Sequence, residues 1–275
     1  MFLLEVFEYE FMNRALIVGV FTAICTAMLG NFVVTARQSV VSDMLAHTAL
    51  VGVGLGIFWQ ISPTYLGFVT TIIAAIILWW LSRDENQAPE AISMLLLTGG
   101  LATALLLTHM QKDNPVSLES YLFGSILTIK ESEMWSFIGL SIIIVGILIS
   151  FWRPFTTLVF DKGFFKTHPY AIFYEILFMI LIAIVVGISL KVIGGLLVGA
   201  LLVIPVLIAQ IFTKSFVQNV CVSVLVNLLA ISTGIFVSFF LDVPTSSAIV
   251  LSLIVLFVVF KVLRLFVLRT LKRGH

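Results

Sequence analysis

Apolar runs without a single charged residue, several long enough to cross a lipid bilayer, make up most of this sequence. The longest run extends from Met44 to Ser82, 39 residues with no Asp, Glu, Lys or Arg. As one continuous α-helix it would measure about 58 Å, roughly twice the hydrocarbon thickness of a bilayer. This run therefore predicts two crossings, joined by a turn between Trp59 and Pro63.

Seven further charge-free runs have the same character. Because backbone groups in hydrocarbon must be hydrogen-bonded within their own segment, we expect each run to be a helix. Charged residues make up 11% of the chain, against about 25% in soluble proteins. The sequence thus predicts an all-α, polytopic membrane protein with about nine transmembrane helices in a single domain, residues 1–275. The seven runs are residues 15–36, 91–111, 134–152, 176–190, 192–213, 215–241 and 243–260.

The distribution of Lys and Arg predicts the orientation in the membrane. If the N-terminus lies outside, 11 of the 15 Lys and Arg residues fall in cytoplasmic connections or in the C-terminal tail. Cytoplasmic loops are enriched in these residues, so we expect the N-terminus outside and the C-terminus in the cytoplasm. The first ten residues contain three Glu and no Lys or Arg, unlike a cleavable signal peptide. The net charge of +1 excludes a polybasic surface for nucleic acid.

One predicted span carries a pair of metal-ligating residue types. Asp43 and His47 are four residues apart, so they share one face of a helix. A carboxylate oxygen and an imidazole nitrogen are ligands for Zn²⁺ or Mn²⁺. Two such pairs, from two copies of the chain around a two-fold axis, would provide four ligands. An ionisable residue inside a membrane indicates function by default, so we predict a metal site at Asp43 and His47.

Two other interpretations of this pair remain open. Asp43 and His47 could form a hydrogen-bonded pair that only fixes helix packing. They could also relay protons in a proton-coupled secondary carrier or an intramembrane enzyme, although such a path would need more ionisable residues than one pair. His109 lies at the outer end of the span 91–111 and is expected to be an exposed residue at a helix end.

Small residues and a proline mark close helix contacts. Gly52 and Gly56, and again Gly195 and Gly199, have the four-residue spacing that lets another helix approach closely. Pro205 lacks an N–H group and predicts a kink. Enzyme motifs are absent: the sequence contains no HExxH, no GxSxG and no P-loop. We therefore expect no enzymatic activity in this chain, and any ATP would be hydrolysed by another polypeptide.

Two connections between spans are long enough to have structure of their own. The outer one contains the semi-apolar segment 121–127, which suits a short helix at the membrane interface. The inner one, about residues 153–170, is the largest cytoplasmic feature apart from the basic tail.

Five segments in the same order resemble the permeases of zinc/manganese ATP-binding-cassette importers. The similar segments are Arg37–Ser39, Ser42–His47 with Gly52–Gly56, Leu122–Leu127, Phe160–Asp161 and Val192–Pro205. The resemblance covers nearly the whole chain. It departs from the family pattern before the second span, where only Arg37 stands in place of an arginine pair, and after Asp161, where lysines and phenylalanines replace acidic and small residues.

The resemblance implies a permease subunit in the plasma membrane of a prokaryote, which moves zinc or manganese as a homodimer. The implied partners are a second copy of the chain, cytoplasmic ATP-binding subunits, an extracellular solute-binding protein and membrane lipid, with no nucleic acid. No permanently bound cofactor is expected, and ATP would bind to the partner subunit. The sequence does not distinguish zinc from manganese or iron. The resemblance places the metal path at Asp43 and His47, and coupling to the ATPase at Phe160, Asp161, Lys162, Gly163, Phe164, Phe165 and Lys166.

Overall fold

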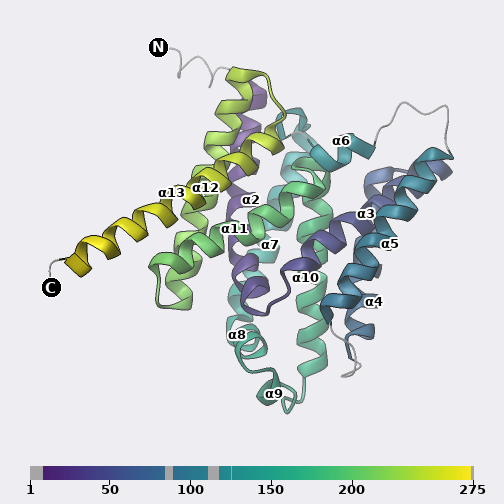
Figure 1. The fold of residues 1–275 in the computed structure, drawn as a ribbon. Coiled ribbons are helices and arrows are strands. Elements are labelled where there is room, and N and C mark those ends of the chain that lie inside the picture. The colour runs from purple at the N-terminus through teal and green to yellow at the C-terminus, as the bar shows by residue number, and fades with distance from the viewer. Residues whose placement is uncertain (1–8, 84–88, 111–117, 125, 274–275) are drawn as a thin grey trace.

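The structure, a computed structural model, is a bundle of long helices (Figure 1). It describes residues 9–83, 89–110, 118–124 and 126–273, and these contain no β-strand. Each predicted span corresponds to one long helix. The long helices are α2 (Glu10–Thr35), α3 (Ser39–Trp59), α4 (Pro63–Leu81), α5 (Pro89–His109), α7 (Glu131–Ser150), α10 (Ala171–Val192), α11 (Gly195–Phe212), α12 (Phe216–Leu241) and α13 (Thr245–Arg273).

Eight of these helices are long and apolar enough to span a membrane, and α11 is the shorter exception among the described residues. With 18 residues, α11 measures about 27 Å, slightly less than the hydrocarbon core of a bilayer. Figure 1 shows α11 inside the bundle, slanted between α12 and α3. The all-α polytopic fold predicted from the sequence is confirmed, with eight full-length spans and a short ninth helix.

The predicted turn in the 39-residue run is present. Helix α3 ends at Trp59, and Gln60 has a left-handed backbone with φ 55°. Pro63 then begins α4, a position where its fixed φ is suitable and its missing N–H leaves no helical bond unmade.

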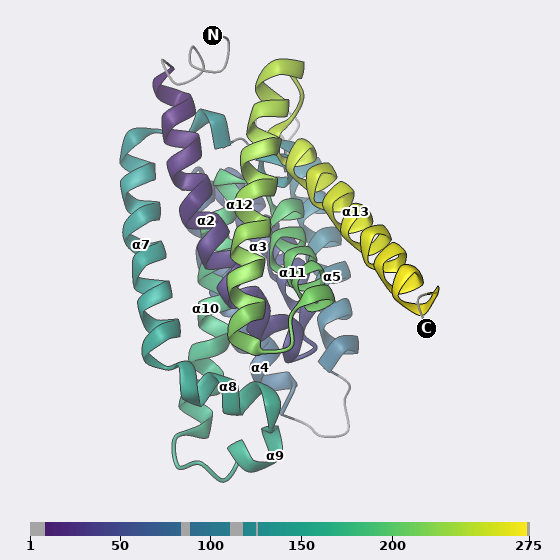
Figure 2. The same ribbon diagram turned by 90° about the vertical axis from the view of Figure 1, so that its left-hand side faces the viewer.

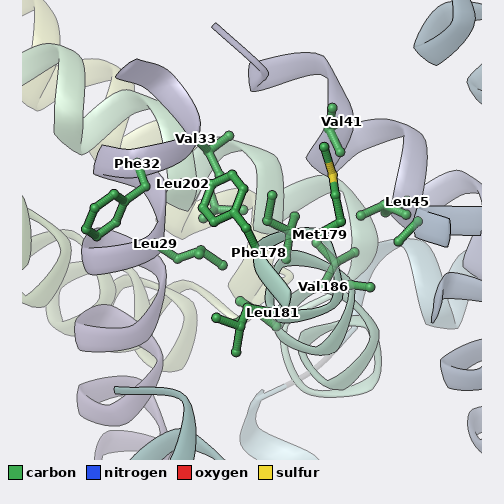
Figure 3. Packing of buried hydrophobic residues seen from close by; sticks show 14 of the residues in the cluster. Leu29, Phe32, Val33, Val41, Leu45, Phe178, Met179, Leu181, Val186 and Leu202 are labelled. Atoms are coloured by element: carbon green, nitrogen blue, oxygen red, sulfur yellow. The ribbon is translucent and has the colours of Figure 1, made fainter. Parts of the chain in front are cut away.

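The largest cluster of buried apolar residues joins α2, α3, α10 and α11. Figure 3 shows Leu29 of α2, Leu45 of α3, Phe178 of α10 and Leu202 of α11 in the space between these helices, whereas the ring of Phe32 of α2 points away from it. Phe32, Leu45 and Leu202 are completely buried. Helices α3 and α11 are therefore held from several sides, and both matter for the candidate site.

Glycines bring the helix backbones into direct contact. A Cβ atom added to Gly30 of α2 would lie 3.0 Å from the Cα atom of Leu202 in α11 and would overlap the Leu202 carbonyl oxygen. One added to Gly52 would overlap the carbonyl oxygen of Leu66 in α4, and one added to Gly56 would lie 2.6 Å from the Cα atom of Pro63. The close approach predicted for Gly52 and Gly56 is confirmed, and α4 is the helix that approaches.

Short helices cover the two ends of the bundle. Helix α6 (Leu118–Phe123) and the 3-10 turn η2 (Ile126–Thr128) occupy the predicted outer segment, apart from Ser125, which lies outside the described residues. Helices α8 (Trp152–Phe160) and α9 (Lys162–Phe165) lie at the opposite end, beyond the end of α7 (Figures 1 and 2).

The cap formed by α6 is fixed to α11 through two glycines. Gly124 has φ 54° and Gly194 has φ 92°, values that L side chains rarely adopt. A Cβ atom at Gly124 would lie 2.8 Å from the Cα atom of Gly194, and one at Gly194 would overlap the backbone of Leu122 and Phe123. Both positions therefore require glycine for backbone conformation and for space.

Pro205 lies inside α11, and Asn227 of α12 compensates for its missing N–H. In a regular helix the N–H of residue 205 would bond to the carbonyl oxygen of Leu201. Here the Asn227 side-chain amide donates to that carbonyl oxygen at 3.1 Å. The same Nδ2 atom lies 3.0 Å from Thr26 Oγ1 and 3.4 Å from the carbonyl oxygen of Ala23, both in α2. One buried side chain thus joins α2, α11 and α12.

This arrangement predicts that substitutions of Asn227 and Pro205 have non-additive effects on the free energy of unfolding. Asn227→Leu should lower the free energy of unfolding by about 1–3 kcal/mol, because it leaves the Leu201 carbonyl buried without a donor. Pro205→Ala supplies the missing N–H, so the double variant should lose about 1 kcal/mol less than the sum of the single variants. Unfolding of the four proteins in detergent, followed by circular dichroism, measures both effects. Strictly additive losses would show that Asn227 does not act through the Leu201 carbonyl.

Candidate functional site

Asp43 and His47 lie one turn apart near the start of α3. Helix α3 begins at Ser39, so Asp43 is about 6 Å and His47 about 12 Å along the helix axis from that residue. Asp43 is exposed in the single chain, and His47 is half-buried. The Nδ1 atom of His47 is buried and has no hydrogen-bond partner in the described part of the chain.

The exposure of Asp43 limits what can lie next to this face of α3. A charged Asp facing lipid costs about 2.5–3.5 kcal/mol on membrane-insertion scales. Intramembrane carboxylates therefore face a protein partner or a water-filled path. The carboxylate of Asp43 and the imidazole of His47 are the metal-ligating groups that this face of α3 carries.

Two glycines of α11 bring this helix against the ligand face of α3. A Cβ atom added to Gly199 would overlap Oδ1 of Asp43, and one added to Gly195 would lie 3.4 Å from Cβ of Ala46. The close packing that the sequence predicts for these two glycines is present, and α3 is the partner helix. Gly199 is a site residue that sequence reasoning missed, because no pattern in the sequence relates it to Asp43.

A second carboxylate lies near the start of another long helix. The charge-free run of the sixth predicted span begins at Ile176, directly after Glu175. Helix α10 begins earlier, at Ala171, so Glu175 lies four residues inside it, as Asp43 does in α3. Glu175 Oε2 accepts a hydrogen bond of 3.2 Å from Nε1 of Trp79 in α4. Glu175 therefore lies in the part of α10 that precedes its charge-free run, beside the last turn of α4.

A single chain does not complete a metal site. No group of three or more His, Cys, Asp or Glu side chains that could hold a metal ion occurs within the described ranges. His109 is exposed at the C-terminal end of α5, and His168 is exposed beyond α9. Asp43 and His47 supply two ligands, so an ion held in four-coordinate geometry needs further ligands from outside this chain.

The predicted coupling residues form a compact projection. Asp161 Oδ1 accepts a hydrogen bond of 2.9 Å from the Phe164 N–H and so caps α9. Phe165 is buried and stacks on the ring of His168, with 5.8 Å between the ring centroids. Phe160 and Phe164, by contrast, are 63% and 66% exposed. Gly163 and Lys166 are exposed as well, whereas the side chain of Lys162 lies outside the described structure.

Comparison with known proteins identifies the same family as the sequence resemblance. The chain matches the model of the ABC 3 transport family over residues 8–264. It is 34% identical over 146 residues to the high-affinity zinc uptake system membrane protein ZnuB of Haemophilus influenzae, covering 53% of this chain and 56% of that protein. It is 23% identical over 157 residues to the manganese transport system membrane protein MntC of Halalkalibacterium halodurans, covering 57% and 54%. In these matches the chain spans little more than half the length of each relative.

A solved structure shares the fold over nearly the whole chain. The structure described as PsaBC from Streptococcus pneumoniae in complex with Fab aligns with a TM-score of 0.81 and 23% identity, covering 94% of both chains. The family match extends over most of the sequence and agrees with eight membrane-spanning helices. This chain is therefore a multi-pass membrane protein that belongs to the ABC 3 transport family.

Proposed function

We propose that this chain is the permease subunit of an ATP-binding-cassette importer for zinc or manganese, and that it works as a homodimer in the plasma membrane. The observation that carries the proposal is the exposed carboxylate of Asp43 beside His47, on a span that is otherwise almost entirely apolar. The relatives named for zinc and for manganese transport support the substrate class.

A second copy of the chain would complete the ligand set. Two protomers related by a two-fold axis would contribute two Asp43 carboxylates and two His47 rings to one path, the four ligands that a divalent transition metal ion accepts. The pairing would also remove Asp43 from lipid. The ion is cargo in this proposal, and no permanently bound cofactor is required.

The proposal also specifies the orientation in the membrane and where the partner subunits bind. The excess of Lys and Arg in alternate connections supports an outer N-terminus and a cytoplasmic C-terminus, which places α8 and α9 in the cytoplasm. A separate ATP-binding subunit would dock there, and a solute-binding protein would deliver the ion at the outer end, near α6. Movement of α11 relative to α3 would shift the Asp43 carboxylate, because Gly199 lies directly against it.

Removal of the proposed ligands tests the metal path. Asp43→Ala and His47→Ala should each lower uptake of radioactive zinc or manganese at limiting metal by more than about tenfold, since even residues that only orient a ligand cost 10- to 100-fold in metal affinity. His109→Ala is the matched control, because His109 is exposed at a helix end. Uptake is measured in cells that lack other importers, with permease abundance checked by immunoblot. Uptake equal to that of the parent chain would remove Asp43 and His47 from the path.

The same cells distinguish an ATP-driven importer from a proton-coupled carrier. We expect uptake to stop when ATP is depleted while the proton gradient is maintained. Uptake that follows the proton gradient and continues without ATP would contradict the proposal and favour a proton relay at Asp43 and His47.

A single methyl group at Gly199 should disturb transport without unfolding the protein. The added Cβ atom would displace the Asp43 carboxylate, which is exposed and can rotate away. Gly146 of α7 is the matched control, because a Cβ atom there would meet nothing within 4 Å. Both substitutions by Ala should favour the helix by about 0.5–1 kcal/mol. Only Gly199→Ala should change the KM for metal uptake, and an equal KM in the two variants would exclude this contact from the path.

Substitution of an exposed aromatic residue in the projection formed by α8 and α9 tests the ATPase interface. Phe164 is 66% exposed at the proposed cytoplasmic end, and Phe123 is 42% exposed in α6 at the opposite end. Phe164→Ala should reduce co-purification of the co-expressed ATP-binding subunit by at least about fivefold, because exposed aromatic rings dominate many interfaces. Phe123→Ala should leave co-purification unchanged. Full retention of the subunit by the Phe164 variant would place the interface elsewhere.

A further inference from the structure

A cavity of about 530 Å³ lies at the α8–α9 end of the bundle, separate from Asp43 and His47. Its walls come from the last turn of α4, from α8, from the first two turns of α10 and from the connection between α2 and α3. This volume is within the range of cavities that bind small molecules, about 300–1,000 Å³. Nothing in the proposed transport path uses it.

The inner wall of the cavity is apolar. Leu158 and Val159 of α8 and Phe178 and Met179 of α10 line it, and each is at most 8% exposed. An apolar wall of this kind suits hydrocarbon rather than a free inorganic ion.

The remaining lining is charged. Arg83, Lys166 and Glu175 line the cavity, so its side chains carry two positive formal charges and one negative. The Arg83 guanidinium lies over the ring of Trp79, 5.1 Å from the ring centroid, and Trp79 also donates to Glu175. Trp79 therefore holds a cation and a carboxylate at the same edge of the cavity. The positive excess favours an anionic ligand.

Two lining residues also have buried polar atoms that no hydrogen bond satisfies. These atoms are Gln38 Oε1 and Ser82 Oγ, each without a partner in the structure as described. An unsatisfied buried acceptor costs about 1–3 kcal/mol. A ligand with hydroxyl groups would offer hydrogen bonds to these atoms once the side chains turn toward it.

The position of the cavity corresponds to the lipid headgroup level. Trp and Tyr concentrate at the boundary between hydrocarbon and water. Trp80 and Tyr170 are both 65% exposed and directly adjoin the lining residues Trp79 and Ala171 in the chain. Basic pockets between membrane helices on the cytoplasmic side are suited to phospholipid headgroups.

We propose that this cavity binds an anionic phospholipid with a hydroxyl-bearing headgroup, of the phosphatidylglycerol type. Arg83 and Lys166 hold the phosphate diester, the headgroup hydroxyls donate to the acceptors at Gln38 and Glu175, and the first methylenes of an acyl chain lie on the wall of Phe178 and Met179. The lipid joins α4 and α10 to α8, the helix that leads into the projection. This binding site does not depend on which ion the chain transports.

Native mass spectrometry of the full-length chain in detergent tests the assignment. Dioleoyl phosphatidylglycerol should bind at least about fivefold more tightly than dioleoyl phosphatidylethanolamine, and Arg83→Gln should weaken phosphatidylglycerol binding by about tenfold. Arg153→Gln is the matched control: Arg153 is an exposed cation of α8 that does not line the cavity. Equal losses in the two variants, or no loss in either, would overturn the proposal.

A second variant covers the case in which Arg83→Gln disturbs folding. Ala171→Leu adds an apolar side chain to the cavity lining without changing its charge. It should lower phosphatidylglycerol binding severalfold while the unfolding temperature stays within a few degrees of the parent value. Unchanged binding would show that the lipid binds elsewhere. Displacement of the lipid by millimolar inorganic phosphate, without preference between the two lipids, would identify a free-anion site and would also overturn the proposal.

Discussion

Direct backbone contact between helices is the constraint on which the rest of this structure depends. In lipid, two apolar helices gain little from hiding their side chains from the solvent, so they associate through close van der Waals contact and a few hydrogen bonds. Gly30 against Leu202 and Gly52 against Leu66 are contacts of this kind, and the backbone of Gly199 lies against the side chain of Asp43. The last one is unusual, because a backbone approach between α11 and α3 determines where a carboxylate can lie.

Three polar groups of the bundle have separate roles. Asn227 replaces the hydrogen bond that Pro205 removes and ties three helices together. Glu175 is paired with Trp79 beside the cavity at the α8–α9 end. Asp43 differs from both, since it is exposed in the single chain while lying on a spanning helix. That difference is the reason for assigning it to a path rather than to packing.

Much of this architecture could be predicted from charge-free runs, because a charged residue in hydrocarbon is costly enough to mark the limits of a span. The double crossing between Met44 and Ser82 and the turn before Pro63 follow from length and composition alone. Helix limits are less predictable, because a helix can extend past the hydrocarbon: α10 begins five residues before its charge-free run and so includes Glu175. The pairing of Asp43 and His47 on one face follows from helix periodicity. The contacts of Gly199 with Asp43 and of Asn227 with Leu201 depend on which helices become neighbours, and no local pattern contains that information.

The facing glycines at positions 124 and 194 have a mechanical consequence. Because the two backbones touch with no side chain between them, there is no compressible layer to absorb a displacement. The α6 cap and the first turn of α11 should consequently behave as one rigid lever, with Gly199 on the α11 arm. A sideways displacement of α6 would thus be transmitted to the Asp43 carboxylate through the main chain alone.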